Sequence, residues 1–186
     1  MKALELLLKR SSHSKLTLPA PTDDELSTLF QAALRAPDHA GLRPWRFDVY
    51  KSPQALQLLG DKLVQASLAE EPELSVEQQT KIRNLPSRAP VVVVAITEYL
   101  EHPKVPAIEQ AISCGCAVHG MLLAAQAMGY GGYWRTGSLA FNQALKAEFG
   151  IKASDEIVGF LYLGTPLVNV EKPSMAAPEQ YFNIIE

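Results

Sequence analysis

Cysteine is almost absent from this chain, which has only Cys114 and Cys116 among its 186 residues. Two cysteines so close together exclude the disulfide framework of a small secreted domain, so we expect a reducing compartment, the cytoplasm. Residues two positions apart on a helix point about 200° apart around its axis, so the two thiols cannot bind one metal ion together. Cys116 does share a face with His119, but a structural zinc site usually has four ligands. We therefore predict no metal site and interpret both cysteines as small buried residues.

Excess positive charge is also absent, because 17 basic residues stand against 20 acidic ones and the net charge is −3. No block of Lys and Arg is dense enough to follow a phosphate backbone, so no nucleic-acid partner is expected. The apolar stretches fall short of the ~20 residues that a membrane span needs, so no membrane partner is expected either. We interpret residues 1–9 as a helix, because Glu5 interrupts their apolar run and no small-residue cleavage site follows.

What the chain does have is the composition of an ordinary globular protein, with 47% hydrophobic and 20% charged residues. Its length fits one domain, 1–186, and is sufficient to bury a core without disulfides or a structural metal. No internal repeat and no long linker divides it.

Several segments carry clear signals for helices and strands. Thr22, with Glu25 three residues later, is typical of a capping box, and the helix that starts there should run to about Arg35, before Pro37. The run Val91–Ile96 is typical of a central strand buried on both faces. The stretch 105–128 is rich in Ala and nearly uncharged, which predicts a helix covered by protein on both sides. We also expect helices over 4–9 and 141–149, two surface helices within 52–84, strands over 46–50 and 157–163, and a loop at 133–137 after the glycines of 129–132.

Three polar clusters are candidates for ligand binding. Arg10-Ser11-Ser12 combines a guanidinium and two hydroxyls in a loop, which are the donors that a phosphate monoester needs. The segment 35–46 brings three arginines, His39 and Trp45 into the connection between a helix and a strand. In Gly131–Gly137, glycines allow a planar ligand to approach the backbone, and Arg135 with Thr136 offers donors.

Each cluster taken alone is equally compatible with a structural role, as a solvated loop, a core tryptophan or a tight turn. The glycine spacing is neither GxGxxG nor a P-loop, so neither a Rossmann fold nor an NTPase follows from it. No pair of carboxylates and no Ser/His/Asp set stands out, which leaves glycoside hydrolysis and acyl transfer without support.

Taken together and in this order, the clusters resemble those of the nitroreductase family, over nearly the whole chain. The resemblance is carried by several motifs in register: 35–39 (RAPDH), 43–47 (RPWRF), 104–106 (KVP), 109–110 (EQ), 115–118 (GCAV), 131–137 (GGYWRTG) and 157–166 (IVGFLYLGTP).

The resemblance implies an α+β, nitroreductase-like fold with a central, mainly antiparallel sheet flanked by helices. It implies an intertwined homodimer with two FMN sites at the subunit interface. The activity it implies is FMN-dependent hydride transfer from NADH or NADPH to a small-molecule acceptor, such as a nitroaromatic or a quinone, in a ping-pong cycle. No catalytic side chain is implied, because the flavin carries the chemistry.

The resemblance also implies site residues. His39 is expected to serve the cofactor of the partner subunit. The implied FMN-binding residues are Arg10, Ser11, Ser12, Arg35, His39, Trp134, Arg135 and Thr136. A contact with NAD(P) is implied at Ala124, Ala125, Gln126, Ala127, Met128 and Gly129.

This chain departs from the usual family pattern at three positions. The family often has arginine where this chain has Ser11 and Lys15, so we expect weaker phosphate binding. Relatives often carry Gln in place of Arg43, and a further cation facing the flavin or the substrate would favour an anionic group there.

Two other functions stay open from the sequence. One is an FMN-binding carrier or sensor protein with little turnover, which NAD(P)H oxidation in the presence of an acceptor would distinguish from an enzyme. The other is a structural dimer whose Arg-rich loops are only solvated, which the absence of bound flavin would favour.

Overall fold

The structure is a computed structural model that describes residues 2–168 and 176–186. Its centre is a five-stranded sheet in which every pairing is antiparallel, with the order β1-β5-β3-β2 and with β4 also paired to β5. The strands are β1 (Leu16–Thr17), β2 (Trp45–Tyr50), β3 (Val91–Thr97), β4 (Gly131–Arg135) and β5 (Glu156–Pro166).

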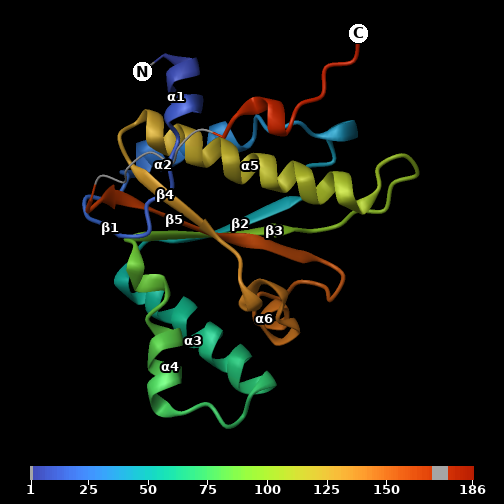
Figure 1. Ribbon diagram of the computed structural model, residues 1–186. Coiled ribbons are helices and arrows are strands. Elements are labelled where there is room, and N and C mark those ends of the chain that lie inside the picture. Colours follow the sequence, from blue (N-terminus) through green and yellow to red (C-terminus); the bar gives the residue numbers. More distant parts are fainter. Residues whose placement is uncertain (1, 169–175) are drawn as a thin grey trace.

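Helices cover both faces of this sheet, which makes the fold α+β (Figure 1). On one face lie α1 (Ala3–Lys9), α2 (Asp23–Ala33) and α5 (Ala107–Ala127). On the other lie α3 (Pro53–Glu70), α4 (Val76–Arg83) and α6 (Gln143–Glu148). Single 3₁₀ turns are found at His39–Gly41, Pro86–Arg88, Ser138–Phe141 and Pro178–Gln180.

Strand β3 divides the core into two layers, as its unbroken apolar run predicts. All seven of its residues are buried. Val92, Val94 and Ile96 pack toward α3, whereas Val91, Val93 and Ala95 pack toward α2 and α5. Because each fully buried Val or Ile side chain contributes roughly 1.5–3 kcal/mol, β3 is a principal source of stability for both layers.

The sequence signals for the helix starts are confirmed. Thr22 caps α2 in a complete capping box with Glu25, and the helix ends at Ala33, two residues before the expected end. Ser52 caps α3 and Ser75 caps α4. The expectation of two surface helices in this region was wrong in one respect, since five residues of α3 are buried: Leu59, Gly60, Leu63, Val64 and Ala66.

The expected loop at 133–137 was the main error in the fold. Residues 131–135 form β4 and pair with β5, from Gly131 opposite Gly164 to Arg135 opposite Phe160. The two glycines suggested a turn, but here they allow close packing, because a Cβ on Gly131 would lie 2.7 Å from Pro166. Two further strand segments were missed, since β1 was not expected and β5 continues past Leu163 to Pro166.

Helix α5 has the length and composition that would allow it to cross a membrane, contrary to the expectation that no apolar stretch is long enough. The core helix of a soluble protein passes the same test. The sequence predicted a central or interface helix covered on both sides, and within one subunit the face that packs on α2, β3 and β5 is buried. Ile108 and Ile112 on the opposite face are 64% and 57% exposed.

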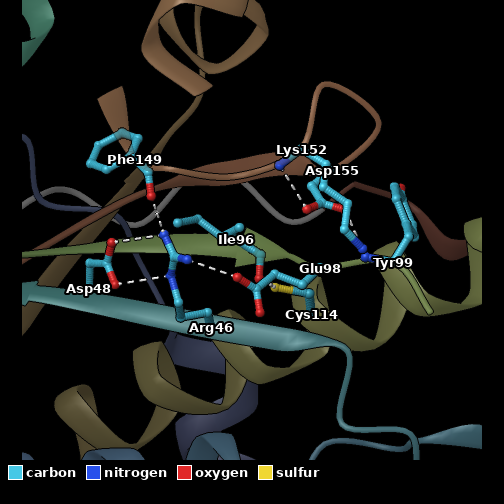
Figure 2. Close-up of polar contacts among 9 residues, drawn as sticks. All are labelled: Arg46, Asp48, Ile96, Glu98, Tyr99, Cys114, Phe149, Lys152 and Asp155. Atoms are coloured by element: carbon cyan, nitrogen blue, oxygen red, sulfur yellow. Dashed lines mark hydrogen bonds and ion pairs between the residues drawn. The ribbon is translucent and has the colours of Figure 1, made fainter. Parts of the chain in front are cut away.

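A polar network ties the edge of the sheet to the segment after α6 (Figure 2). The Arg46 guanidinium donates to Glu98 and to the Phe149 carbonyl, both at 2.8 Å, and lies 3.3 Å from Asp48. Nearby, the buried Asp155 carboxylate accepts the backbone N–H groups of Tyr99 and Lys152. These bonds fix the loops at one end of β3 and β5, and two backbone N–H groups satisfy the buried Asp155 carboxylate.

We predict that Gly60→Ala destabilises the protein. Gly60 is buried in α3, and a Cβ there would lie 2.1 Å from the Arg83 carbonyl oxygen, which belongs to the backbone. Overpacking of this kind costs about 1–3 kcal/mol in the free energy of unfolding, measured by urea titration. As a control, Ala69→Gly on the exposed side of α3 should cost only about 0.5–1 kcal/mol. A Gly60→Ala variant as stable as the unaltered protein would contradict this packing.

Candidate functional site

The first polar cluster is held against the end of α5 and the start of β4. The Gln126 side-chain amide donates to the Lys9 carbonyl at 3.0 Å and accepts the Ser11 N–H at 3.3 Å. The His13 N–H donates to the Gly132 carbonyl at 3.0 Å. The structure therefore brings together the loop 10–13, the helix end 124–129 and the glycines of β4, which are far apart in the sequence.

The donors of this loop have little to bind within the chain. The Arg10 guanidinium has a single long contact to Ser12 Oγ, at 3.4 Å, and Ser11 Oγ lies 3.4 Å from His13 Nε2. Arg10 and Ser11 are half-buried and Ser12 is exposed. The loop thus presents a guanidinium and two hydroxyls to a ligand on a backbone that is already anchored.

His13 lies beneath this loop, and the sequence analysis did not single it out. Its Nδ1 is buried without a hydrogen-bond partner among the described residues. Burial, and then the positive charge of Arg10, lower the pKa of His13 from its ordinary value. The imidazole is therefore favoured in its neutral form beneath the loop. Its place next to the cluster in sequence was the only signal that could have identified it.

In the third cluster, residues 131–137, the side chains of Trp134 and Arg135 lie on opposite faces of the sheet. Trp134 points toward α5, where its indole N–H donates to the Val158 carbonyl at 3.2 Å, so this side chain is used by the fold itself. Arg135 points the other way and stacks on Tyr133 at 4.4 Å. With Thr136 it lines a hollow of about 450 Å³ whose other walls include Leu63, Leu139, Phe160 and Tyr162.

The second cluster lies at the opposite end of α5. Ser113 Oγ donates to the Pro37 carbonyl at 2.6 Å, and His39 Nδ1 lies 2.6 Å from Glu109. Glu109 and Gln126 are about 25 Å apart along the helix axis. Arg35, just beyond the end of α2, is exposed on the same side as this loop. Within one chain, His39 and Arg10 therefore cannot contact the same small ligand.

Most of the arginines that lack a carboxylate partner within the described residues lie in the three polar clusters. Of the seven arginines, Arg46 and Arg83 bind carboxylates at 2.8 Å. The other five have no carboxylate partner within the described residues, and four of these lie in the clusters: Arg10, Arg35, Arg43 and Arg135. In a chain with more acidic than basic residues, guanidinium groups left unpaired are available for phosphate or carboxylate ligands.

This fold and this arrangement of donors define a nitroreductase. The model of the nitroreductase family matches residues 7–165, and the chain belongs to that family. Among curated proteins it is 42% identical over 166 residues to "Putative NAD(P)H nitroreductase YdjA" of Escherichia coli, covering 89% of each chain.

Two solved structures show the same fold. One is a nitroreductase-like family protein from Bacillus cereus, with a TM-score of 0.84 and 22% identity, covering 100% of this chain and 97% of the other. The second is a nitroreductase with bound FMN from Bacteroides fragilis, with a TM-score of 0.72 and 18% identity, covering 100% of both chains.

The residues of the anchored loop fit an FMN phosphate. A phosphate monoester needs several converging donors, and the Arg10 guanidinium with the Ser11 and Ser12 hydroxyls supplies them on one short segment. Gly131 and Gly132 of β4 open no space beside this loop, because neighbouring side chains already fill the positions that a Cβ would take. No group of three or more His, Cys, Asp or Glu side chains suited to a metal ion occurs within 2–168 and 176–186.

We predict that His13 makes stability depend on pH. Its folded pKa is lowered, so its neutral form is favoured by folding, and protonation favours the unfolded chain. The contribution is complete above the unfolded value of about 6.5 and is lost as pH falls through the lowered folded value. When the pH is lowered from about 7.5 to 5, the melting temperature of the His13→Gln variant should therefore fall less than that of the unaltered protein. The control His102→Gln changes a histidine outside this loop, and its melting temperature should depend on pH as in the unaltered protein. The same dependence of melting temperature on pH in all three proteins would contradict the prediction.

Proposed function

We propose that this protein is an FMN-dependent oxidoreductase that takes hydride from NADH or NADPH and reduces a small electron-poor acceptor, such as a nitroaromatic or a quinone. The observation that carries the proposal is the loop 10–12, whose unpaired guanidinium and hydroxyls are fixed by Gln126 at the edge of the sheet. Membership of the nitroreductase family supports the reaction class, and a relative named as an NAD(P)H nitroreductase supports the hydride donor.

In this proposal, Arg10, Ser11 and Ser12 bind the FMN phosphate and ribityl chain. Gln126 positions them, since its amide holds the backbone on both sides of Arg10. Trp134 and Thr136 contribute through the β4 backbone and the loop after it, and Arg135 supplies a positive charge next to Tyr133. When bound, the flavin accepts hydride and passes reducing equivalents to the acceptor. Ala124 and residues 126–129 contact the nicotinamide nucleotide beside the same loop, whereas Ala125 is buried in the core and is not available to it.

The other half of the site comes from a second copy of the chain. His39 contacts Glu109, about 25 Å along α5 from Gln126, so it is too far away to reach the same flavin within one subunit, and Arg35 begins the same loop. If α5 packs antiparallel on its two-fold copy, the N-terminal end of one helix lies beside the C-terminal end of the other. That arrangement brings His39 of each subunit to the phosphate loop of its partner.

Exposed apolar side chains support this dimer. The free face of α5 carries a stripe with its centre near Cys116, namely Ile108, Ile112, Cys116, His119 and Leu123. Leu4, Leu7 and Leu8 of α1 are also exposed, at 73%, 52% and 65%. The C-terminal segment runs on the α5 side of the sheet (Figure 1), with Tyr181, Phe182, Ile184 and Ile185 exposed by 71–94%. Apolar surface of this extent on one side marks a protein interface, and the extended tail suits an intertwined homodimer.

The visible absorption spectrum tests the proposed function. We expect the purified protein to bind FMN and to show flavin bands that bleach when NADH or NADPH is added without oxygen and return when an acceptor follows. Arg10→Gln should weaken FMN binding by roughly tenfold or more, measured by flavin fluorescence, because a hydrogen bond from a charged donor contributes about 1.5–3 kcal/mol. Arg88→Gln, which changes an exposed arginine outside the site, is the control.

The outcomes distinguish the rival functions. A protein that refuses added FMN would overturn the proposal and favour a structural dimer. Bound FMN that neither donor reduces, or that no acceptor reoxidises beyond the rate with oxygen alone, would favour a carrier or sensor with little turnover.

A further inference from the structure

Arg43 is the most unusual residue of the loop between α2 and β2. Its backbone has φ +51°, a left-handed conformation that a residue with a side chain seldom adopts, and Ala40 and Gly41 are left-handed as well. The Asp38 carboxylate accepts the Arg43 N–H at 2.8 Å, and the Arg43 carbonyl accepts the Trp45 N–H at 2.8 Å. Since such conformations persist only where the surroundings fix them, the guanidinium projects from a constrained backbone.

The guanidinium itself has no ionic partner. Its side chain is exposed, and within the described residues no carboxylate lies within salt-bridge distance. Asp38 is the nearest acid in sequence, but one of its oxygens is already bound to the Arg43 backbone. His39 is paired with Glu109, and Arg35 is a second unpaired cation of the same loop. Over residues 35–43 the loop thus has two arginines and one aspartate, and neither guanidinium has a carboxylate partner within the described residues.

Beside Arg43 there is a hollow of suitable size for a ring. Leu34, Ala36, Asp38, Arg43 and Trp45 surround about 230 Å³. A cavity of about 150 Å³ takes benzene, so this hollow has room for one substituted aromatic ring next to an indole and a guanidinium. The lining combines apolar side chains, the Trp45 indole and the Arg43 guanidinium with one carboxylate, Asp38, which accepts a hydrogen bond from the Arg43 backbone.

We propose that Arg43 is a specificity-determining residue that binds an anionic group on a planar substrate of this enzyme. The inference rests on the proposed function, in which this loop lies over the flavin of the partner subunit. The anionic group is a carboxylate on an aromatic acceptor or the 2′-phosphate of NADPH, both of which a guanidinium binds through two parallel N–H groups.

Steady-state kinetics of the FMN-loaded dimer test the proposal. Para-nitrobenzoate and para-nitrobenzamide differ in charge but hardly in shape, and NADPH and NADH differ by the phosphate. Arg43→Gln removes the charge and shortens the side chain, so Arg43→Lys, which keeps the charge and most of the length, is tested beside it. Arg43→Gln should raise KM roughly tenfold for the anionic member of one pair and leave the neutral acceptor or NADH unchanged. Arg43→Lys should restore part of the effect, and Arg88→Gln should have none.

A binding measurement provides a second readout. Titration of the oxidised protein with benzoate, followed through the flavin spectrum, should give a weaker affinity for Arg43→Gln than for the unaltered protein if the acceptor carries the anion. A loss confined to NADPH would assign the anion to the 2′-phosphate. If neither pair of substrates is affected, Arg43 has no role in specificity. That failure is distinct from a failure of the proposed function, which would appear as absent FMN or absent NAD(P)H oxidation in the unaltered protein.

Discussion

Helix α5 carries Glu109 as its only Asp, Glu, Lys or Arg residue, and the fold buries one of its faces. Its inner face, with Cys114, Val118 and Met121, packs on the sheet and on α2. Its outer face exposes Ile108 and Ile112. Burial of apolar surface contributes roughly 25 cal/mol per Å², so covering this outer face in the proposed dimer would add to the stability that the inner face supplies within one subunit. The two ends of α5 hold two of the three candidate site segments, and the pairing of β4 with β5 places the third, residues 134–136.

The C-terminal end of α5 is where three separate segments become one site. Gln126 makes two hydrogen bonds to the loop before β1, each with a net contribution of about 0.5–1.5 kcal/mol. These bonds are modest in energy, but they set the direction of Arg10 and of the serine hydroxyls. The N-terminal end of α5 holds the loop with Arg35, His39 and Arg43 through Ser113 and Glu109. One helix thus positions two groups of cations that belong to different sites in the proposed dimer.

Those helices and strands whose signal lies within a short stretch of sequence could be predicted. The capping box at Thr22 and Glu25, the β-branched run of β3 and the uncharged length of α5 each predicted the element that the structure contains. Strand β4 could not be predicted in this way, because its pairing with β5 and the close packing at Gly131 depend on residues distant in sequence. The hydrogen bonds from Gln126 to the loop before β1 and the buried Nδ1 atom of His13 were missed for the same reason. The positive φ of Arg43 could not be predicted from the sequence either, because it depends on the hydrogen bond from the Arg43 N–H to the Asp38 carboxylate.

The central claim is that each flavin site is built from two subunits, and mixed dimers test it most directly. One variant, Arg10→Gln, alters the phosphate loop; the other, Arg35→Gln with His39→Gln, alters the loop assigned to the partner's site. Each alone should bind FMN weakly at both sites. After the two are unfolded together and refolded in equal amounts, the account predicts that tight FMN binding returns at about a quarter of the sites, because random pairing makes half of the dimers mixed and each mixed dimer has one unaltered site. If both groups served the flavin of their own chain, every site would keep one defect, and no tight binding would return.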